Sequence, residues 1–276
     1  MSIITLSTDW GRKGPSVARI KGDIYSELKE AQVVDITHDI SPFDIEEAVY
    51  IIKSSYNAFP KGSIHLIGVD TEIRLHRRHI AMSVDGHYFI CSDNGILALI
   101  CSEYRPEKVV ELEVYQDESS VSSSTKKIFS RAACHLLRWG KLEIIGRSID
   151  RFKSPTELKP QVKENNSLIG TVIYIDHFGN VVINITKKLF DEVGKKRPFE
   201  VQARNYVFRE IYRHYSEAVK DPTREDHYHG DALVRFNPSG YLEIAVYKSN
   251  PRTVGGAETL LGLRRGASVH VKFLQL

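Results

Sequence analysis

Short apolar runs alternate with amphipathic stretches through the first half of the chain. Continuous apolar runs predict strands at 2–8, 32–36 and 63–69. Apolar residues at steps of three and four predict helices at 16–29, 44–55, 94–101 and 128–139. Two further runs, 79–84 and 87–91, flank Asp85-Gly86 and predict a β-hairpin. This alternation favours an α/β domain over 1–152, built on a mostly parallel sheet with helices on both faces.

The pattern changes after residue 152. Residues 153–168 hold two prolines, several charges and an Asn-Asn-Ser sequence, a composition typical of a linker. Beyond it, short apolar runs between turn residues predict strands at 170–175, 181–185, 199–201, 232–236, 242–246 and 268–273. One charged segment, 215–229, interrupts them. We predict an all-β barrel domain over 169–276, and the strand pattern alone also fits a sandwich.

Polar side chains follow the predicted strands of the first domain directly. Asp9 comes after the first strand, His38 and Asp39 after the second, and Asp70 after the third. Ligands of open α/β sheets bind at the carboxyl ends of the strands, so these positions indicate a site at that edge. For Asp9, the alternative is a turn or a helix cap.

Composition narrows the class of protein. The net charge is +3 at pH 7 with interspersed signs, so neither nucleic acid nor a membrane surface is an expected partner. Cys91, Cys101 and Cys134 have no metal-ligand spacing and fit buried thiols of a reducing compartment. No apolar run reaches the roughly 20 residues of a membrane helix, and no signal peptide is evident. The expected location is the cytoplasm.

Six stretches carry a family resemblance that spans nearly the whole chain. They are THDISPFDIEEAVY (37–50), FPKGSIHLIGVD (59–70), SDNGIL (92–97), YIDHFGNVVINI (174–185), GYLEIAV (240–246) and LLGLRRGASVHVKF (260–273). In this order they resemble the S-adenosylmethionine (SAM) hydrolases, or hydroxide adenosyltransferases, which are related to the fluorinases and chlorinases.

The resemblance implies a fold, an assembly and a reaction. The fold is an N-terminal α/β domain with a C-terminal β-barrel. The assembly is a homotrimer whose ligand lies between the N-terminal domain of one subunit and the C-terminal domain of its neighbour. The reaction is an SN2 attack on the ribose 5′ carbon of SAM, in which hydroxide or halide displaces methionine. The leaving thioether is neutral, so the enzyme needs positioning and desolvation, and no metal or cofactor is expected.

The resemblance also implies a catalytic trio, because hydrolases of this family place an Asp, an Arg and a His around the attacking water. The window DTEIRLHRR (70–78) aligns with the family pattern D-P-G-V-G-T-x-R-R and assigns the acid to Asp70 and the arginine to Arg77. A nearby cation keeps a carboxylate ionised, and Asp70 would then orient or deprotonate water. The window SSSTKKIF (122–129) aligns with T-F-H-G-R-D-I-F, which places Ser124 at the histidine position. For the Asp70–Arg77 window the alternative is a surface hairpin with exposed ion pairs. For the Ser124 window it is a polar loop without a catalytic role.

The missing histidine has four candidate replacements from elsewhere in the sequence: His38, His65, His76 and His79. Histidines in strands and loops are more often structural. Halogenating relatives lack the carboxylate that corresponds to Asp70, and a carboxylate beside a desolvated halide repels it. The retained acid therefore argues against halide chemistry.

The resemblance also assigns substrate contacts. Asp9 matches an acid that binds the ribose hydroxyls, Trp10 replaces the usual Phe, and Ser16 is retained. Gly14 replaces an acid that contacts the methionine end. In the C-terminal domain the expected ligand contacts are Phe178, Asn180, Ser239 and Tyr247. Phe178-Gly179-Asn180 also fits a tight turn that needs glycine. Tyr247 stands where relatives carry an adenine-binding Asn, a role that Asn250 could take instead.

Two functions remain open at this stage. The first is a SAM hydrolase that forms adenosine and L-methionine. The second is a diverged member that binds adenosine or another nucleoside without turnover. The retained residues favour the enzyme: Asp9, Ser16, Asp70, Arg77, Phe178 and Asn180. The departures favour the binder: Gly14, Ser124 and Tyr247. A different adenosyl chemistry is a third alternative.

Overall fold

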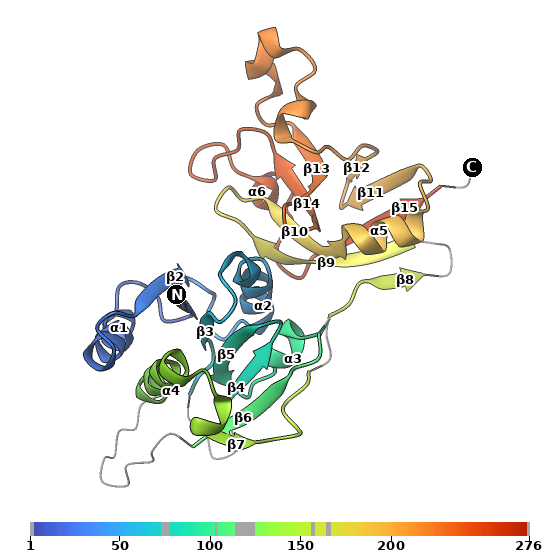
Figure 1. The fold of residues 1–276 in the computed structure, drawn as a ribbon. Helices are drawn as coiled ribbons and strands as arrows, with labels where there is room; N and C mark the ends of the chain where they lie inside the picture. Colours follow the sequence, from blue (N-terminus) through green and yellow to red (C-terminus); the bar gives the residue numbers. More distant parts are fainter. Residues whose placement is uncertain are drawn as a thin grey trace. The chain divides into compact units, whose positions relative to one another are not determined.

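The computed structural model describes residues 3–72, 78–102, 104–113, 125–155, 158–163 and 167–274. The chain divides into two compact units, Met1–Thr156 and Glu157–Leu276 (Figure 1). This division lies inside the segment 153–168 that was predicted as a linker. The same segment also contains β8 (Gln161–Lys163) and the start of β9 (Ser167–Ile175).

A seven-stranded sheet forms the first unit, in the order β2-β1-β3-β5-β4-β6-β7. Its strands are β1 (Ile3–Thr8), β2 (Gln32–Thr37), β3 (Ile64–Gly68), β4 (His79–Val84), β5 (His87–Ser92), β6 (Lys108–Leu112) and β7 (Gly146–Ser148). The pairs β1–β2, β1–β3 and β3–β5 are parallel, and β4–β5, β4–β6 and β6–β7 are antiparallel. The prediction of a mostly parallel sheet is therefore wrong. The β4–β5 hairpin, which was predicted, reverses the chain direction, and β6 and β7 continue the sheet antiparallel.

The helices of this unit lie close to their predicted positions. They are α1 (Ser16–Glu27), α2 (Ile45–Lys53), α3 (Ile96–Ile100) and α4 (Thr125–Trp139), with short 3-10 turns η1 (Tyr56–Ala58) and η2 (Leu142–Ile144). Asp44 caps α2, because its carboxylate accepts the Glu47 amide at 2.9 Å. Within the described residues, no helix is long and apolar enough to cross a membrane.

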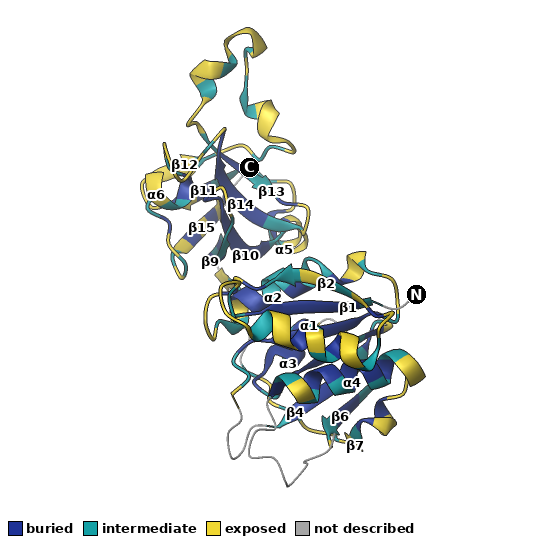
Figure 2. Ribbon diagram, turned by 90° about the vertical axis from the view of Figure 1, so that its left-hand side faces the viewer, coloured by how far each residue is buried: buried dark blue, intermediate teal, exposed yellow. Residues whose placement is uncertain are grey.

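The central strands are buried on both sides (Figure 2). Successive residues of a strand point to opposite faces, and β4 shows this clearly. Ala81 belongs to one apolar cluster with residues of α1 and α4, whereas Ile80 and Met82 belong to another with residues of α2 and α3. The three cysteines are free and buried, as predicted, and burial raises the pKa of Cys134 to about 12.

An eight-stranded antiparallel sheet forms the second unit and curls into a nearly closed barrel, in the order β12-β11-β15-β9-β10-β14-β13, with β8 added beside β9. Its further strands are β10 (Val181–Thr186), β11 (Phe199–Ala203), β12 (Tyr206–Phe208), β13 (Ala232–Phe236), β14 (Tyr241–Val246) and β15 (Ser268–Phe273). The unit is not entirely β, since it also contains α5 (Lys187–Gly194) and α6 (Ala257–Leu260). One continuous apolar cluster fills the interior.

A chain of buried polar groups crosses the first sheet. Thr5 Oγ1 lies 2.7 Å from His65 Nδ1, and His65 Nε2 lies 3.2 Å from His87 Nδ1. Both histidines are 1 % exposed. Burial, with a further contribution from the charge of His87, lowers the pKa of His65 to about 3. The imidazole therefore remains neutral in the folded protein.

We expect the stability of the first unit to fall as the pH falls from neutral toward 3. The unfolded chain binds a proton at His65 below its ordinary pKa of 6.5, whereas the folded chain does so only near 3. The loss from this group between pH 7 and pH 5 is about 2 kcal/mol. Urea denaturation at both pH values measures it. His65→Gln should flatten the pH dependence, and exposed His270→Gln should leave it unchanged; equal slopes in all three proteins would contradict the assignment.

Candidate functional site

The carboxylate of Asp9 organises the carboxyl edge of the first sheet. β1 and β3 run parallel with Thr8 opposite Gly68, so Asp9 and the Asp70 segment leave the sheet side by side. Asp9 Oδ2 accepts the backbone amides of Phe43 at 3.0 Å and of Asp70 at 3.1 Å. Both donors adopt left-handed backbone conformations, with φ of 64° and 46°. Such conformations cost non-glycine residues about 1–2 kcal/mol each, and the charged acceptor offsets this cost.

The chain on either side of Asp70 is held by two other elements. Before it, the buried side chain of Asn94 donates from Nδ2 to the Val69 carbonyl at 3.0 Å. After it, Thr125 at the start of α4 donates from Oγ1 to the Thr71 carbonyl at 2.9 Å. The position of Asp70 is therefore set from both sides by groups distant in sequence. Asn94 falls in the SDNGIL stretch, where an amide after a strand was a signal that sequence reasoning did not use.

Among the four candidate histidines, His79 is joined to this segment. Its Nε2 lies 3.4 Å from Thr125 Oγ1, its Nδ1 lies 3.2 Å from Ser92 Oγ, and its ring meets the edge of Phe129. His79 is buried, and Thr125 links it to Thr71 beside Asp70. His38 and His65 bond to Thr8 and Thr5 respectively, and His76 lies outside the described residues.

Trp10 packs flat against the end of β3. A methyl group at Gly68 would lie 2.6 Å from Trp10 Cζ2, so only glycine leaves space for the indole. On the ring lies Lys126 of α4, with Nζ 4.8 Å from the ring centroid. A cation thus lies on the ring of the residue that follows Asp9. Ser16 is the half-buried first residue of α1.

Arg12 forms a surface ion pair at this edge. Its Nε lies 2.9 Å from Asp39 Oδ2, and both side chains are mostly exposed. The two acids that follow β1 and β2 therefore differ in kind. Asp9 holds two backbone segments, whereas Asp39 forms a surface ion pair.

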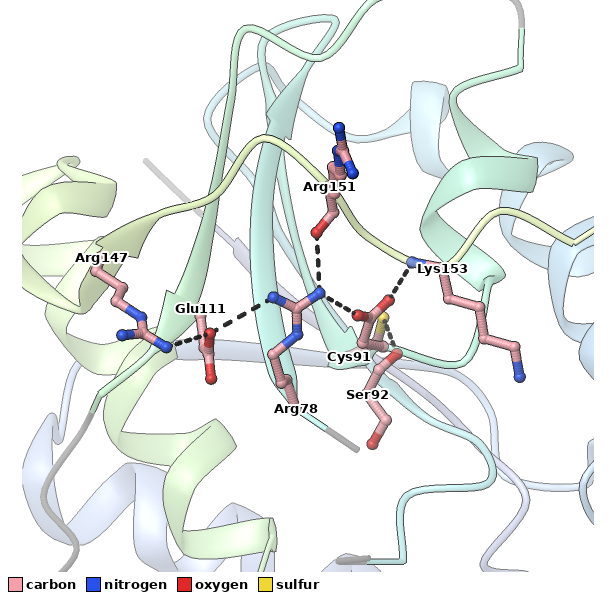
Figure 3. A network of polar contacts seen from close by, with 8 residues as sticks. Arg78, Cys91, Ser92, Glu111, Arg147, Arg151 and Lys153 are labelled. Atoms are coloured by element: carbon pink, nitrogen blue, oxygen red, sulfur yellow. Dashed lines mark hydrogen bonds and ion pairs between the residues drawn. The ribbon is translucent and has the colours of Figure 1, made fainter. Parts of the chain in front are cut away.

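Two predicted catalytic residues, Arg77 and Ser124, lie outside the described residues. The neighbouring Arg78 is described and contacts three other residues (Figure 3). Its Nη2 donates to Asp93 Oδ2 at 2.8 Å and to the Arg151 carbonyl at 2.9 Å, and its Nη1 lies 3.6 Å from Glu111. The other Asp93 oxygen accepts the Lys153 amide at 2.7 Å. Arg78 therefore ties β4 to the chain that leaves this unit.

The second unit carries a pocket of about 440 Å³ at the turn between β9 and β10. It is lined by His177, Phe178, Ser249, Asn250, Pro251 and Arg252. Phe178 is 57 % exposed, and Asn180 is buried with its Oδ1 lacking a hydrogen-bond partner among the described residues. One carboxylate shapes this turn: Asp176 Oδ1 accepts the amides of Phe178 and Asn180, and its Oδ2 accepts Asn180 Nδ2. An acid four residues before an Asn is a turn signal that sequence reasoning also missed.

The other two predicted contacts of this unit lie elsewhere. The Tyr247 ring is buried in a separate apolar cluster with Leu233 and Ala245. Ser239 lies in the turn before β14, whereas Tyr247 follows the opposite end of that strand. Six residues of strand separate them, about 20 Å. Within this unit, the structure brings Phe178 and Asn180 together but does not bring Ser239 to them.

No group of three or more His, Cys, Asp or Glu side chains within the described ranges is placed to hold a metal ion. The chemistry available at the carboxyl edge is therefore that of carboxylates, hydroxyls, an indole and a cation. At the pocket of the second unit, the available groups are an exposed aromatic ring and amides. These arrangements suit a ligand with hydroxyl groups and a flat ring system.

Comparison with known proteins identifies the family. The model of the SAM hydroxide adenosyltransferase N-terminal domain matches residues 4–146, and that of the C-terminal domain matches residues 170–270. The chain belongs to the SAM hydroxide adenosyltransferase family.

Individual relatives cover most of the chain at low identity. The (R)-S-adenosyl-L-methionine hydrolase of Methanocaldococcus jannaschii is 25 % identical, over 91 % of this chain and 90 % of its own length. A fluorinase of Nocardia brasiliensis is also 25 % identical, over 70 % of this chain and 74 % of the relative. The crystal structure of an uncharacterized conserved protein from Thermotoga maritima superimposes with a TM-score of 0.84 at 28 % identity, covering 98 % of this chain and all of that one.

We expect Asp9→Ala to destabilise the first unit by about 2 kcal/mol, because two amides lose a charged acceptor. Asp39→Ala removes an acid at the neighbouring strand end and breaks an exposed ion pair, so its cost should stay below about 0.5 kcal/mol. Chemical denaturation compares the two variants with the unaltered protein. Equal stability of both variants would show that Asp9 does not organise this edge.

Proposed function

We propose that this protein hydrolyses SAM to adenosine and L-methionine, by SN2 attack of water or hydroxide at the ribose 5′ carbon. The observation that carries the proposal is the pairing of Asp9 with the Asp70 segment at the carboxyl edge of the sheet. Membership of the family and the hydrolase relatives support it. Nearly all of the rate acceleration in this reaction has to come from alignment and exclusion of water, since the leaving group needs no proton.

Asp9 would bind the ribose. Among the described residues only its Oδ2 is used, by two amides, so Oδ1 is available to a ribose hydroxyl. The amide bonds fix the carboxylate in one orientation, which reduces the entropy lost on binding. Trp10 lies next to it, and we keep Ser16 as a third contact of this unit.

Asp70 would orient or deprotonate the attacking water, and Arg77 would hold it ionised. Arg78 is bound to Asp93 and the Arg151 carbonyl, so we keep the neighbouring Arg77, which lies outside the described residues, for this role. Ser124 precedes Thr125 directly, and Thr125 joins the Asp70 segment to His79. We assign His79 a positioning role, because Thr125 joins its ring to the Thr71 carbonyl beside Asp70.

In the second unit, Phe178 would pack on the ligand and Asn180 would supply an amide oxygen. The exposed ring and the buried, unpartnered Oδ1 support these roles. Ser239 remains an untested contact. Tyr247 is reassigned below, since its hydroxyl is already bound and its ring is buried away from the pocket.

A second candidate function is nucleoside binding without turnover. Two observations favour it: Lys126 places a cation on Trp10, and Gly14 supplies no acid for the ammonium group of methionine. Asp9 and the Phe178 turn would serve the nucleoside half, whereas Gly14 stands where the amino-acid half would need an acid. A binder needs only the first of these.

The decisive experiment is to incubate the purified protein with SAM and to measure adenosine and methionine by chromatography. We expect both products in equal amounts. Asp70→Ala and Arg77→Ala should each lower the rate by about 100-fold or more. Asp39→Ala is the matched control, an acid after a neighbouring strand, and should retain full activity. Absence of adenosine from the unaltered protein would refute hydrolysis, and calorimetry with adenosine would then test the binder.

We further propose a homotrimer in the cytoplasm, with each ligand shared by the first unit of one subunit and the second unit of its neighbour. The free, buried cysteines support a reducing compartment. The shared site is the expectation of the family resemblance, and it has a specific consequence. A subunit damaged only in its first unit still contributes an intact second unit to the adjacent site.

Coexpression of Asp70→Ala with Phe178→Ala should therefore restore activity. With equal amounts of both chains and random assembly, about one quarter of all sites would receive two intact halves. Hydrolysis should be measured below the KM of the unaltered protein, where Phe178→Ala alone is nearly inactive. Light scattering gives the subunit number. Activity equal to the average of the two separate variants would refute a shared site.

A further inference from the structure

The segment between β12 and β13, residues 209–231, has no role in the proposed function. It contains the 3-10 turns η3 (Tyr215–Ala218) and η4 (Pro222–Tyr228). Figure 1 shows it in orange, projecting from β13, and Figure 2 shows that most of its residues are exposed. Its less exposed residues include Ala218, Val219 and Tyr228, which pack against Leu233, Ala245 and Tyr247. The segment therefore covers the outer side of β13 and β14.

Tyr247 fastens this segment to the chain that enters the pocket. Its hydroxyl donates to Glu225 Oε1 at 2.7 Å. Its amide donates to the Asp231 carbonyl at 2.8 Å, and its carbonyl accepts the Gly230 amide at 3.0 Å. The hydrogen bond to Glu225 raises the pKa of Tyr247, so the phenol remains a donor at neutral pH. The middle of η4 and the chain just after it are thus bound to one residue.

The pocket begins two residues further along the chain. Lys248 adopts a left-handed conformation, with φ of 52°, and turns the chain toward Phe178. Ser249 Oγ then donates to the Phe178 carbonyl at 3.0 Å, and Ser249 and Asn250 line the pocket. The Asn250 carbonyl accepts the amides of the next loop residues, among them Gly255 at 3.0 Å. A shift of Tyr247 would therefore also shift Ser249 and Asn250, which form one wall of the pocket.

Tyr215 connects the segment to the opposite wall. Its hydroxyl donates to Glu243 Oε1 at 2.7 Å, and its ring lies 4.5 Å from the Arg235 guanidinium carbon. Glu243 is 5 % exposed and pairs across the sheet with Val182, two residues after Asn180. Asp176, which holds the Phe178-Gly179-Asn180 turn, is close enough for its charge to act on Glu243. The contact to this wall is less direct than the one through Tyr247.

We infer that segment 209–231 is a positioning element for the pocket, and that Tyr247 and Tyr215 are its positioning residues. Tyr247 sets the wall formed by Ser249 and Asn250, and Tyr215 supports the wall formed by Phe178. Each hydroxyl donates its proton to a carboxylate and so has none to donate to a ligand. The inference rests on the proposed function only for what the pocket binds. It predicts an effect on substrate affinity and none on the chemical step.

Hydrogen exchange of the whole protein, followed by mass spectrometry, tests this positioning without any ligand. In Tyr247→Phe the ring stays in place and one hydrogen bond is lost, so amides of 248–256 should exchange about five-fold faster. Tyr215→Phe should act on 176–180 instead. Tyr212→Phe is the matched control in the same segment, because its hydroxyl also donates to a carboxylate, Glu210 at 2.6 Å, but reaches neither wall.

Kinetics provide the second readout. Tyr247→Phe should raise KM several-fold at unchanged kcat, and Glu225→Gln, which retains an oxygen acceptor, should preserve the KM of the unaltered protein. Unchanged exchange at 248–256 in Tyr247→Phe, or an equal change in Tyr212→Phe, would overturn the inference. So would a fall in kcat at constant KM. If the unaltered protein shows no turnover, hydrolysis fails, but the exchange data still decide the positioning role and adenosine affinity replaces KM.

Discussion

The first unit depends on one charged hydrogen-bond acceptor. Asp9 Oδ2 receives two backbone amides, from Phe43 after β2 and from Asp70 after β3, and both donors have left-handed backbone conformations. Three parallel strands thus end at a single carboxylate. Without it, two turns would lose the interaction that compensates their strain.

The second unit repeats the device. Asp176 accepts the amides of Phe178 and Asn180, and the turn it holds presents an exposed aromatic ring. In both units a carboxylate stabilises backbone, and the backbone places the groups that we propose for the ligand. Because these contacts do not depend on the neighbouring side chains, the surrounding sequence can diverge. The window DTEIRLHRR lacks the Pro and Gly residues of the family pattern. The Asp70 amide is nevertheless bound by Asp9, and the adjacent carbonyls are bound by Asn94 and Thr125.

The distribution of charge accounts for the doubt about the amino-acid half of the substrate. Arg12 is neutralised at the surface by Asp39, but Lys126 lies on Trp10 beside Asp9. A cation at that place favours a negatively charged group on the ligand and disfavours an ammonium. Its effect is on specificity, and it does not alter the arrangement of Asp9 and Asp70.

Much of the fold followed from local pattern. Period-2 and period-3.6 repeats located β1, β3, the β4–β5 hairpin and α2 with its Asp44 cap, because they report which face of an element is buried. The adjacent placement of Asp9 and Asp70 followed too, since both end neighbouring strands. The direction of β4, β6 and β7 did not, because strand pairing joins residues far apart in sequence and leaves no periodic signal.

The same limit applies to the site. The sequence by itself determined which acids stand at strand ends and that the turn before Asn180 needs glycine. Only the tertiary structure decided that His79 reaches Asp70 through Thr125, that Arg78 is occupied by Asp93, and that Tyr247 binds Glu225. Each of these contacts spans between 15 and 54 residues of chain. The choice of partner depends on packing and burial, which no local stretch of sequence contains.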